Sequence, residues 1–291
     1  RGLNFEYRQY RYFFDISPTT RFHCWNGHCG AVASSIGGQL PHRNMLNMEV
    51  CVDSIQSAIN AETGGAKRIE LCCSMSEGGT TPSIGLLKVI KRTISLPVFA
   101  MIRPRGGDFL YTDAEFEVMI EDCKQLINAG ADGVVYGILT KKGEVDVSRC
   151  QKLLDIVKPR PVTFHRAFDM VPDQSAALEV IINLGFDRIL TSGGKADVLQ
   201  GASRVKDLVN QAKKRILIIP GGGINEDNLA EILQVTGARE FHGSARVKVT
   251  SQMEYHNNSI SMGGTGDEYQ YNVASLERIK RLTVIAKDFL K

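Results

Sequence analysis

Long hydrophobic runs are missing from this chain of 291 residues. No apolar stretch approaches the roughly 20 residues of a membrane-spanning helix, and no signal-peptide core stands near the start, so we expect no membrane partner. An excess of charge is missing too, because the net charge is only +3 and no basic cluster stands out. This argues against nucleic-acid binding. Seven cysteines, several inside strand-like or helix-like segments, indicate reduced thiols and favour the cytoplasm, with the nucleus as the alternative.

Residues 1–47 lack the periodicity of the remaining chain, since proline and glycine interrupt them repeatedly. We therefore expect a disordered or loosely packed N-terminal extension over 1–47, followed by one domain over 48–291. The run His23-Cys24-Trp-Asn-Gly-His28-Cys29 superficially resembles a metal knuckle. A zinc site normally needs a second ligand pair at a defined spacing, and none follows nearby, so the extension is the preferred interpretation.

From Met48 onward one unit recurs: a short apolar run, a loop marked by Gly, Pro or Asp, and a segment with helical periodicity. The expected strands are 48–52, 68–72, 98–103, 133–137, 162–165, 188–191, 216–220 and 240–242. The expected helices include 84–94, 114–129, 176–184, 199–212, 228–235 and 273–290. Strand–helix units repeated over about 240 residues predict an α/β protein with a (β/α)8 TIM barrel. A doubly wound open sheet is the alternative, weakened because no Gly-x-Gly-x-x-Gly fingerprint follows the first strand.

Two successive strands end with a carboxylate two residues before a thiol, in Glu49-Val-Cys51 and Glu70-Leu-Cys72. Because side chains alternate along a strand, each carboxylate shares a face with its thiol. The working groups of a barrel lie at the carboxyl ends of its strands. The same positions on other strands add Met101, Arg103, His165 and His242.

Two thiolates with an imidazole or a thioether suit a soft Cu(I) ion. Cys51 and Cys72 are therefore candidate metal ligands, with His165 or Met101 as a third donor. Free cysteine also behaves as a small buried hydrophobe, so a purely structural role stays open.

The two carboxylates are candidates for acid–base chemistry together with His165. A carboxylate inside a barrel is costly unless it is paired, and Arg103, one strand over from Glu70, is the expected partner. That pair could serve structure alone. His242 is a further pocket candidate, and Asp169 is either a residue that orients a neighbouring group or a loop cap.

Three loops have features of anion sites. Loops after strands seven and eight are the usual phosphate site of a barrel, and paired arginines suit carboxylate or phosphate. The candidate anion-binding residues are Arg103, Arg105, Gly222, Gly223, Ser244 and Arg246. Against this, Glu226 and Asp227 would complement the next helix dipole themselves, and tight corners need glycine anyway. The polar stretch 247–272 is either a lid or a subunit contact.

From Met48 to its end, about five-sixths of its length, the chain resembles the CutC family of copper homeostasis proteins. The motifs that carry the resemblance are Met48-Glu-Val-Cys-Val-Asp53, Arg68-Ile-Glu-Leu-Cys72, Glu77-Gly-Gly-Thr-Thr-Pro-Ser83, Met101-Ile-Arg-Pro-Arg-Gly-Gly-Asp-Phe109, Val162-Thr-Phe-His-Arg-Ala-Phe-Asp-Met170, Pro220-Gly-Gly-Gly-Ile224 and Glu240-Phe-His242. The resemblance implies a cytosolic TIM-barrel protein, a homo-oligomer (dimer or tetramer), that binds Cu(I) through Cys51 and Cys72. Animal relatives often carry a further cysteine where this chain has Gly243, and a site that used that thiol would be weakened here.

Two functions follow from these observations. The first is a copper homeostasis protein that binds a copper ion, as Cu(I), through its strand-end cysteines and contributes to copper tolerance or trafficking. The alternative is a TIM-barrel enzyme for a small anionic or phosphorylated metabolite. Its acid–base groups would be Glu49 or Glu70 with His165, and Arg103, Gly222 and Arg246 would hold the anion. The sequence neither supports nor excludes a scaffold role through the outer surface of the barrel, and it assigns no reaction.

Overall fold

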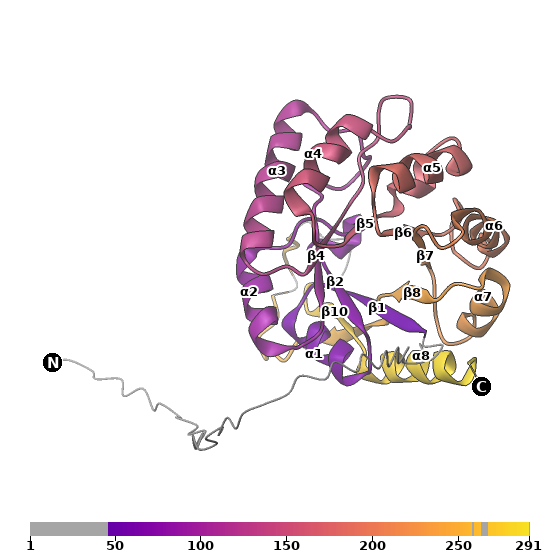
Figure 1. The fold of residues 1–291 in the computed structure, drawn as a ribbon. Helices are drawn as coiled ribbons and strands as arrows, with labels where there is room; N and C mark the ends of the chain where they lie inside the picture. The colour runs from indigo at the N-terminus through magenta and orange to yellow at the C-terminus, as the bar shows by residue number, and fades with distance from the viewer. Residues whose placement is uncertain (1–45, 258, 263–266, 291) are drawn as a thin grey trace, which may run out of the picture. The chain divides into compact units, whose positions relative to one another are not determined.

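The computed structural model describes residues 46–257, 259–262 and 267–290. The predicted extension over 1–47, with its metal-knuckle run 23–29, therefore lies almost wholly outside the described residues. Strands and helices alternate along the chain, and the helices surround the strands (Figure 1). None of the helices in these ranges is both long and apolar enough to cross a membrane.

Eight parallel strands form one sheet in the order β7-β6-β5-β4-β3-β2-β1-β8. Their bounds are β1 (Asn47–Val52), β2 (Arg68–Leu71), β3 (Val98–Met101), β4 (Gly133–Tyr136), β5 (Val162–Phe164), β6 (Arg188–Thr191), β7 (Leu217–Pro220) and β8 (Glu240–Gly243). A parallel bridge between Gly221 and His242 joins β7 to β8 and brings the ring together. The predicted TIM barrel is confirmed, and the open-sheet alternative is wrong because the two outer strands meet.

The helices are α1 (Ile55–Thr63), α2 (Ile84–Thr93), α3 (Asp113–Asn128), α4 (Val147–Val157), α5 (Gln174–Leu184), α6 (Ala202–Ala212), α7 (Leu229–Thr236) and α8 (Leu276–Asp288). Most begin after a Ser, Thr or Asp whose side chain accepts a hydrogen bond from a backbone N–H of the first turn. At α3 the Thr112 and Glu115 side chains cap each other's backbone N–H groups, which fixes the start of the longest helix.

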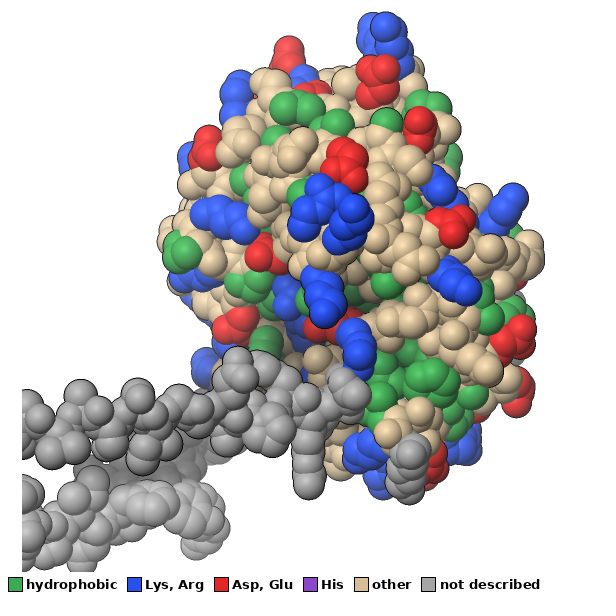
Figure 2. Space-filling view, turned by 45° about the vertical axis from the view of Figure 1, so that its right-hand side comes forward, with side chains coloured by type: hydrophobic (Ala, Val, Ile, Leu, Met, Phe, Trp, Pro, Cys, Tyr) green, Lys and Arg blue, Asp and Glu red, His purple; other side chains and the backbone are tan. Residues whose placement is uncertain are grey.

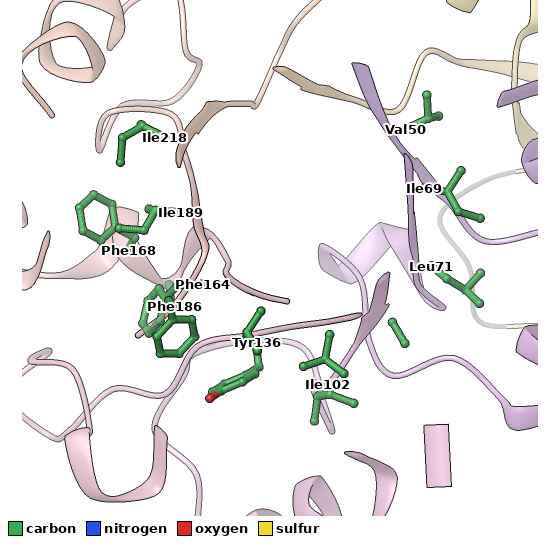
Figure 3. Packing of buried hydrophobic residues seen from close by; sticks show 14 of the residues in the cluster. Val50, Ile69, Leu71, Ile102, Tyr136, Phe164, Phe168, Phe186, Ile189 and Ile218 are labelled. Carbon is green, nitrogen blue, oxygen red and sulfur yellow. The ribbon is translucent and has the colours of Figure 1, made fainter. Parts of the chain in front are cut away.

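Apolar side chains on the outer side of the strands hold the barrel to its helices. Val50, Ile69 and Leu71 lie there, and Figure 3 shows them with Ile189 and Ile218 around the outside of the ring. Each fully buried side chain of this size contributes about 1.5–3 kcal/mol to folding. Since successive residues point to opposite faces, this outer layer leaves the inward positions of β1 and β2 to charged and sulfur-containing side chains.

Strand register determines which inward side chains become neighbours. Between β1 and β2, Cys51 is the partner of Glu70. Between β1 and β8, Glu49 is the partner of His242. The carboxyl ends of β8, β1 and β2 therefore bring a histidine, two carboxylates and the thiols to one part of the barrel mouth.

The stretch 247–272 contains ordered structure that the sequence pattern did not predict. Strand β9 (Arg246–Thr250) pairs antiparallel with β10 (Gln270–Ala274). The helix predicted over 273–290 is therefore wrong at its start, because Ala274 belongs to β10 and Ser275 caps α8. Ser57 and Asn60 of α1 bond the backbone N–H and carbonyl of Ala274, which fixes the hairpin to the barrel.

The surface carries charges of both signs. On the face shown in Figure 2, Lys and Arg side chains are interspersed with Asp and Glu. This mixed pattern is typical of a solvated surface.

Candidate functional site

A cavity of about 340 Å³ opens at the carboxyl ends of the strands. Six of the side chains predicted to meet at the barrel mouth line it: Cys51, Glu70, Met101, Arg103, His165 and His242. Asp169 lines it as well. Its walls therefore come from β1, β2, β3, β6 and β8 and from the segments that follow β2, β3 and β5, the usual location of a barrel's functional groups.

Two thiols lie side by side at this cavity, and Cys51 is the one that lines it. The Sγ atoms of Cys51 and Cys72 are 3.6 Å apart, and both thiols are free and buried. Met75 brings a third sulfur, with its Sδ 3.3 Å from Cys51 Sγ. Met75 begins the short 3-10 helix Met75–Glu77 that follows β2. The sequence reasoning missed it, although it stands only three residues after Cys72.

The loop after β2 packs tightly over the thiols. Gly79 has φ +91, and a Cβ there would lie 3.0 Å from Cys72 Sγ. Only glycine combines this left-handed backbone with so close an approach. The loop therefore holds Met75 close to the sulfur pair.

Arg103 stabilises this loop and does not pair with Glu70. Its Nη1 donates to the carbonyls of Glu77 and Gly79 at 2.7 and 2.9 Å, and its Nη2 donates to the Gly107 carbonyl at 2.8 Å. The predicted Glu70–Arg103 ion pair is wrong. Strand β3 ends at Met101, so Arg103 already belongs to the loop layer and its guanidinium reaches the neighbouring loop backbone.

His242 connects the two strand-end carboxylates. Its Nδ1 lies 2.8 Å from Glu49 Oε1, and its Nε2 lies 3.7 Å from Glu70 Oε2. The other oxygen of Glu49 pairs with Arg68 Nε. Both oxygens of Glu49 are therefore occupied, and this side chain is not among those that line the cavity.

Further ion pairs continue from Glu49 and Arg68 toward the other end of the barrel. Arg68 Nη2 lies 2.7 Å from Glu240, and Arg188 Nε lies 3.4 Å from the same carboxylate. Arginines and carboxylates thus alternate through the barrel interior, which satisfies charges that would be costly alone. Arg68 was not among the predicted residues, although strand alternation places it on the same face as Glu70.

The protonation of these groups follows from their neighbours. Burial alone would raise the pKa of Glu49, but Arg68 and His242 hold that pKa at about 2. Burial raises the pKa of Glu70, an effect that His242 opposes. For His242, burial disfavours the charged form, but Glu70 and Glu49 raise its pKa well above the ordinary value. At neutral pH the ring is an imidazolium held between two carboxyl groups.

The thiols are protonated in the metal-free protein at neutral pH. The contact with Cys72, together with burial and the Glu70 carboxylate, raises the pKa of Cys51 well above its ordinary value. The contact with Cys51 lowers the pKa of Cys72, but burial and Glu70 outweigh it and bring that pKa to about 12. A metal that binds these sulfurs must therefore displace their protons.

The sulfur geometry fits a soft metal ion. Thiolate–metal bonds of about 2.3 Å allow one ion to join sulfurs up to about 4.6 Å apart, and the observed 3.6 Å lies within that range. Thiolates and thioethers select Cu(I). Among the described residues, ligand atoms of Cys51, Glu70 and His242 also lie within 4.8 Å of one another. His242 and the two thiols all have to lose a proton before they can bind a metal, so the preference for the sulfurs as first ligands comes from the softness of Cu(I).

His165 lies on another wall of the cavity. Its Nδ1 accepts a hydrogen bond from the Ala167 N–H at 3.2 Å, and its ring centroid lies 4.9 Å from that of Phe109. Burial, with the nearby Arg103 charge, lowers the pKa of His165 to about 3. The ring is therefore neutral, and since Nδ1 is the acceptor, the proton lies on Nε2.

Asp169 acts as a loop cap. It accepts hydrogen bonds from the Thr191 hydroxyl at 2.5 Å and from the backbone N–H groups of Ser192 and Gly194 at 3.1 Å. It also pairs with Arg166 at 2.7 Å. These contacts organise the loop after β6. Of the two roles that the sequence suggested for Asp169, they correspond to the loop cap.

The predicted anion-binding residues do not gather at one place. Of the six, only Arg103 lines the barrel-mouth cavity. Arg105 pairs with Glu115 at 2.6 Å and Asp108 at 3.1 Å. Gly222 lies against Arg166, and Ser244 is half-buried after β8.

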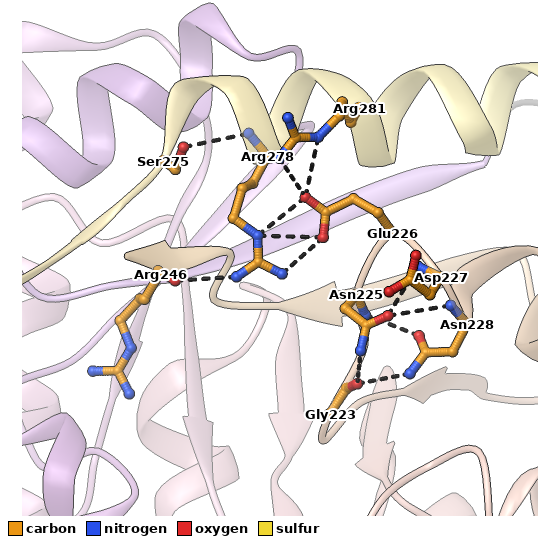
Figure 4. A network of polar contacts seen from close by, with 9 residues as sticks. All are labelled: Gly223, Asn225, Glu226, Asp227, Asn228, Arg246, Ser275, Arg278 and Arg281. Atoms are coloured by element: carbon orange, nitrogen blue, oxygen red, sulfur yellow. Dashed lines mark hydrogen bonds and ion pairs between the residues drawn. The ribbon is translucent and has the colours of Figure 1, made fainter. Parts of the chain in front are cut away.

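Near the loops after β7 and β8, the carboxylate of Glu226 already pairs with two arginine side chains. Arg278 and Arg281 bond Glu226 at 2.8 and 2.9 Å. The Gly223 carbonyl accepts from Asn228 at 2.9 Å. Arg246 contributes its carbonyl to Arg278, while its side chain points away from this network (Figure 4). Glu226 precedes α7 and is not part of its first turn, contrary to the sequence-based expectation.

Comparisons with known proteins agree with this architecture. The model of the CutC family matches residues 46–247. The human copper homeostasis protein cutC homolog is 52% identical over 255 residues, which cover 87% of this chain and 93% of that protein. The mouse protein of the same name is 53% identical over 249 residues, 85% of this chain and 92% of that protein.

Solved structures give the same result. The copper homeostasis protein CutC of Streptococcus agalactiae is 35% identical, with a TM-score of 0.66 over 69% of this chain and 99% of that chain. A thiamine phosphate pyrophosphorylase from Pyrococcus furiosus is 18% identical, with a TM-score of 0.53 over 86% of this chain and 99% of that chain. The second similarity concerns the fold alone.

Proposed function

The chain belongs to the CutC family, and on that premise we propose that it binds Cu(I) at the barrel mouth through Cys51 and Cys72. The observation that carries the proposal is the 3.6 Å separation of the two thiol sulfurs. A thioether supports it, because Met75 Sδ lies 3.3 Å from Cys51 Sγ. Met75 replaces His165 and Met101 as the proposed third donor, since of these three side chains it is the one whose donor atom contacts a thiol.

The surroundings support binding of an ion that arrives from solution. Cys51 and Met75 line the cavity, whereas Cys72 is fully buried behind them. An ion would meet Cys51 and Met75 first and Cys72 second. Each thiol that becomes a ligand loses its proton, so the two negative charges formed would neutralise the single positive charge of Cu(I) and leave one negative charge in excess.

The proposal is tested by replacing the two thiols together. We expect wild-type protein, titrated anaerobically with Cu(I) against a competing chelator, to bind close to one ion per chain. Changes outside the ligand sphere often cost 10- to 100-fold in affinity, so Cys51→Ser with Cys72→Ser should weaken binding by more than about 100-fold. Unchanged affinity in that double variant would overturn the proposal.

A matched control removes two buried thiols elsewhere. Cys123 lies in α3 and Cys150 in α4, both fully buried. Cys123→Ala with Cys150→Ala should leave Cu(I) binding unchanged. Thermal unfolding of both double variants shows that any lost binding does not come from lost folding.

We also propose that the protein contributes to copper tolerance or trafficking in the cytoplasm, or in the nucleus, as a homo-oligomer. Apolar side chains exposed on and beside the β9–β10 hairpin support self-association: Met253, Tyr255, Ile260, Met262 and Tyr271. Light scattering after size exclusion should give a mass above that of one chain. A monomer at every concentration would contradict the oligomer.

A further inference from the structure

Three buried side chains of the cavity each keep one polar atom without a hydrogen-bond partner in the described part of the chain. These atoms are Glu70 Oε1, Arg103 Nε and His165 Nε2. Each of the three residues is at most 5% exposed, and all three line the same cavity. Buried polar groups in proteins are nearly always hydrogen-bonded. Three such side chains around one cavity indicate that the cavity receives a polar molecule.

Two of these atoms are donors on one wall. Because His165 Nδ1 accepts the Ala167 N–H at 3.2 Å, the neutral ring presents an Nε2–H. The Nη atoms of Arg103 are occupied by loop carbonyls, which leaves its Nε–H. Both groups pack on Phe109, with the guanidinium carbon 5.1 Å and the imidazole centroid 4.9 Å from the ring centre. A charged guanidinium and two N–H donors flanking one aromatic ring suit a carboxylate.

The third atom belongs to the sulfur-containing wall. Glu70 uses Oε2 toward Cys72 and His242, at 3.6 and 3.7 Å, and leaves Oε1 unpaired. A hydroxyl group can donate to a carboxylate or accept from a carboxylic acid, so it satisfies Oε1 in either protonation state. The complement of this wall is a hydroxyl.

The size and apolar lining of the cavity suit a small organic molecule. Its volume of about 340 Å³ lies at the lower end of the range for ligand pockets, roughly 300–1,000 Å³. Phe109, Met170 and Leu190 supply apolar surface between the polar groups. An inorganic anion would leave the Glu70 side unsatisfied, whereas a carbon chain with a different group at each end reaches both walls.

We propose that the barrel mouth binds a small hydroxylated carboxylate, with its carboxylate at Arg103 and His165 and a hydroxyl at Glu70. The inference goes beyond copper binding and does not depend on it, because none of the three groups is a sulfur ligand. The molecule bound there would be either an organic substrate or an acid that carries copper to the neighbouring thiols.

The test uses chelator-treated, metal-free protein and three probes with the same carbon skeleton. Glycerate has the carboxylate and the hydroxyls, propionate lacks the hydroxyls, and glycerol lacks the carboxylate. We expect saturable glycerate binding in the millimolar range by saturation-transfer NMR. Propionate should bind at least tenfold more weakly, and glycerol should show no saturable binding. Absent glycerate binding, or equal affinity for glycerate and propionate, would overturn the proposal and assign the unpaired atoms to water alone.

Variants of His165 keep the test specific. His165→Asn offers an oxygen to the Ala167 N–H but removes the Nε2–H, and should weaken glycerate binding about tenfold or more. His165→Gln can present an amide N–H near the Nε2 position and should restore part of the affinity. Wild-type affinity in His165→Asn would contradict the assignment. Cys123→Ala with Cys150→Ala, which changes buried thiols away from the cavity, should keep glycerate binding. The glycerate titration uses metal-free protein, so a failure of the copper proposal and a failure of this one are distinguishable.

Discussion

The Nδ1 atom of His242 lies 2.8 Å from Oε1 of Glu49, and this contact joins the charged interior of the barrel to its sulfur-containing mouth. Glu49 is fixed on its other side by Arg68, and His242 reaches Glu70 beside the thiols. The position of the metal-binding candidates is therefore determined by buried ion pairs as well as by the strands.

Glu49→Gln should destabilise the protein strongly. The change keeps the shape but removes the negative charge between Arg68 and His242. Removing one partner of a buried pair typically costs about 3–5 kcal/mol, so the free energy of unfolding from urea denaturation should fall by about 3 kcal/mol. Glu277→Gln is the control, because its side chain is 70% exposed and surface changes usually stay within about 0.5 kcal/mol. Equal stability of Glu49→Gln and the control would show that the pair contributes little.

The two cavity histidines should differ in protonation. Two carboxyl groups raise the pKa of His242, whereas burial lowers that of His165 to about 3. In long-range ¹H–¹⁵N spectra of metal-free protein at pH 7, His242 should show two protonated ring nitrogens. His165 should stay neutral, with its proton on Nε2, from pH 8 down to 5. Titration of His165 near pH 6.5 would contradict the burial argument.

Met75→Leu should weaken Cu(I) binding less than loss of the thiols. The change keeps the apolar volume but removes the sulfur that lies 3.3 Å from Cys51 Sγ. We expect about a tenfold loss of affinity, since a neutral thioether contributes less than a thiolate. Met170→Leu is the control, because Met170 lines the same cavity but is 66% exposed. Equal effects of the two substitutions would remove Met75 from the ligand set.

The ion pairs of Glu226 with Arg278 and Arg281 should stabilise the protein at neutral pH and lose this effect in acid. Arg278, with help from Arg281 and against the effect of burial, lowers the pKa of Glu226 to about 2. A carboxyl whose pKa is lower in the folded state stabilises the protein above its unfolded pKa, about 4.3, and loses that contribution as the pH falls toward 2. The site is partly solvated, so the contribution is at most about 1 kcal/mol.

Thermal unfolding of Glu226→Gln beside wild type measures this contribution. The difference in melting temperature should be largest near pH 6 and should disappear between pH 4.5 and 2. A difference that grows on acidification has the wrong sign for a lowered pKa.

The barrel was predictable because its strands repeat one pattern, in which apolar runs end at glycine-marked loops. The thiol pair was predictable for a related reason. Alternation puts Cys51 and Cys72 on inward faces, and adjacent parallel strands bring those faces together. Local periodicity and the barrel architecture were sufficient for both.

Other features depend on loop conformation, which periodicity does not encode. Met75 reaches Cys51 because left-handed residues, Ser74 and Gly78, turn the chain back over the strand ends. Arg103 fails to meet Glu70 because β3 ends two residues earlier than predicted. The β9–β10 hairpin joins segments separated by a long connection, so no short-range pattern marks it.

X-ray absorption at the copper edge of anaerobically loaded protein tests the central claim most directly. The account predicts a first coordination shell of sulfur, with two thiolates from Cys51 and Cys72, that is lost in the Ser/Ser variant. A shell of nitrogen and oxygen, or a sulfur shell that persists without these two residues, would contradict it.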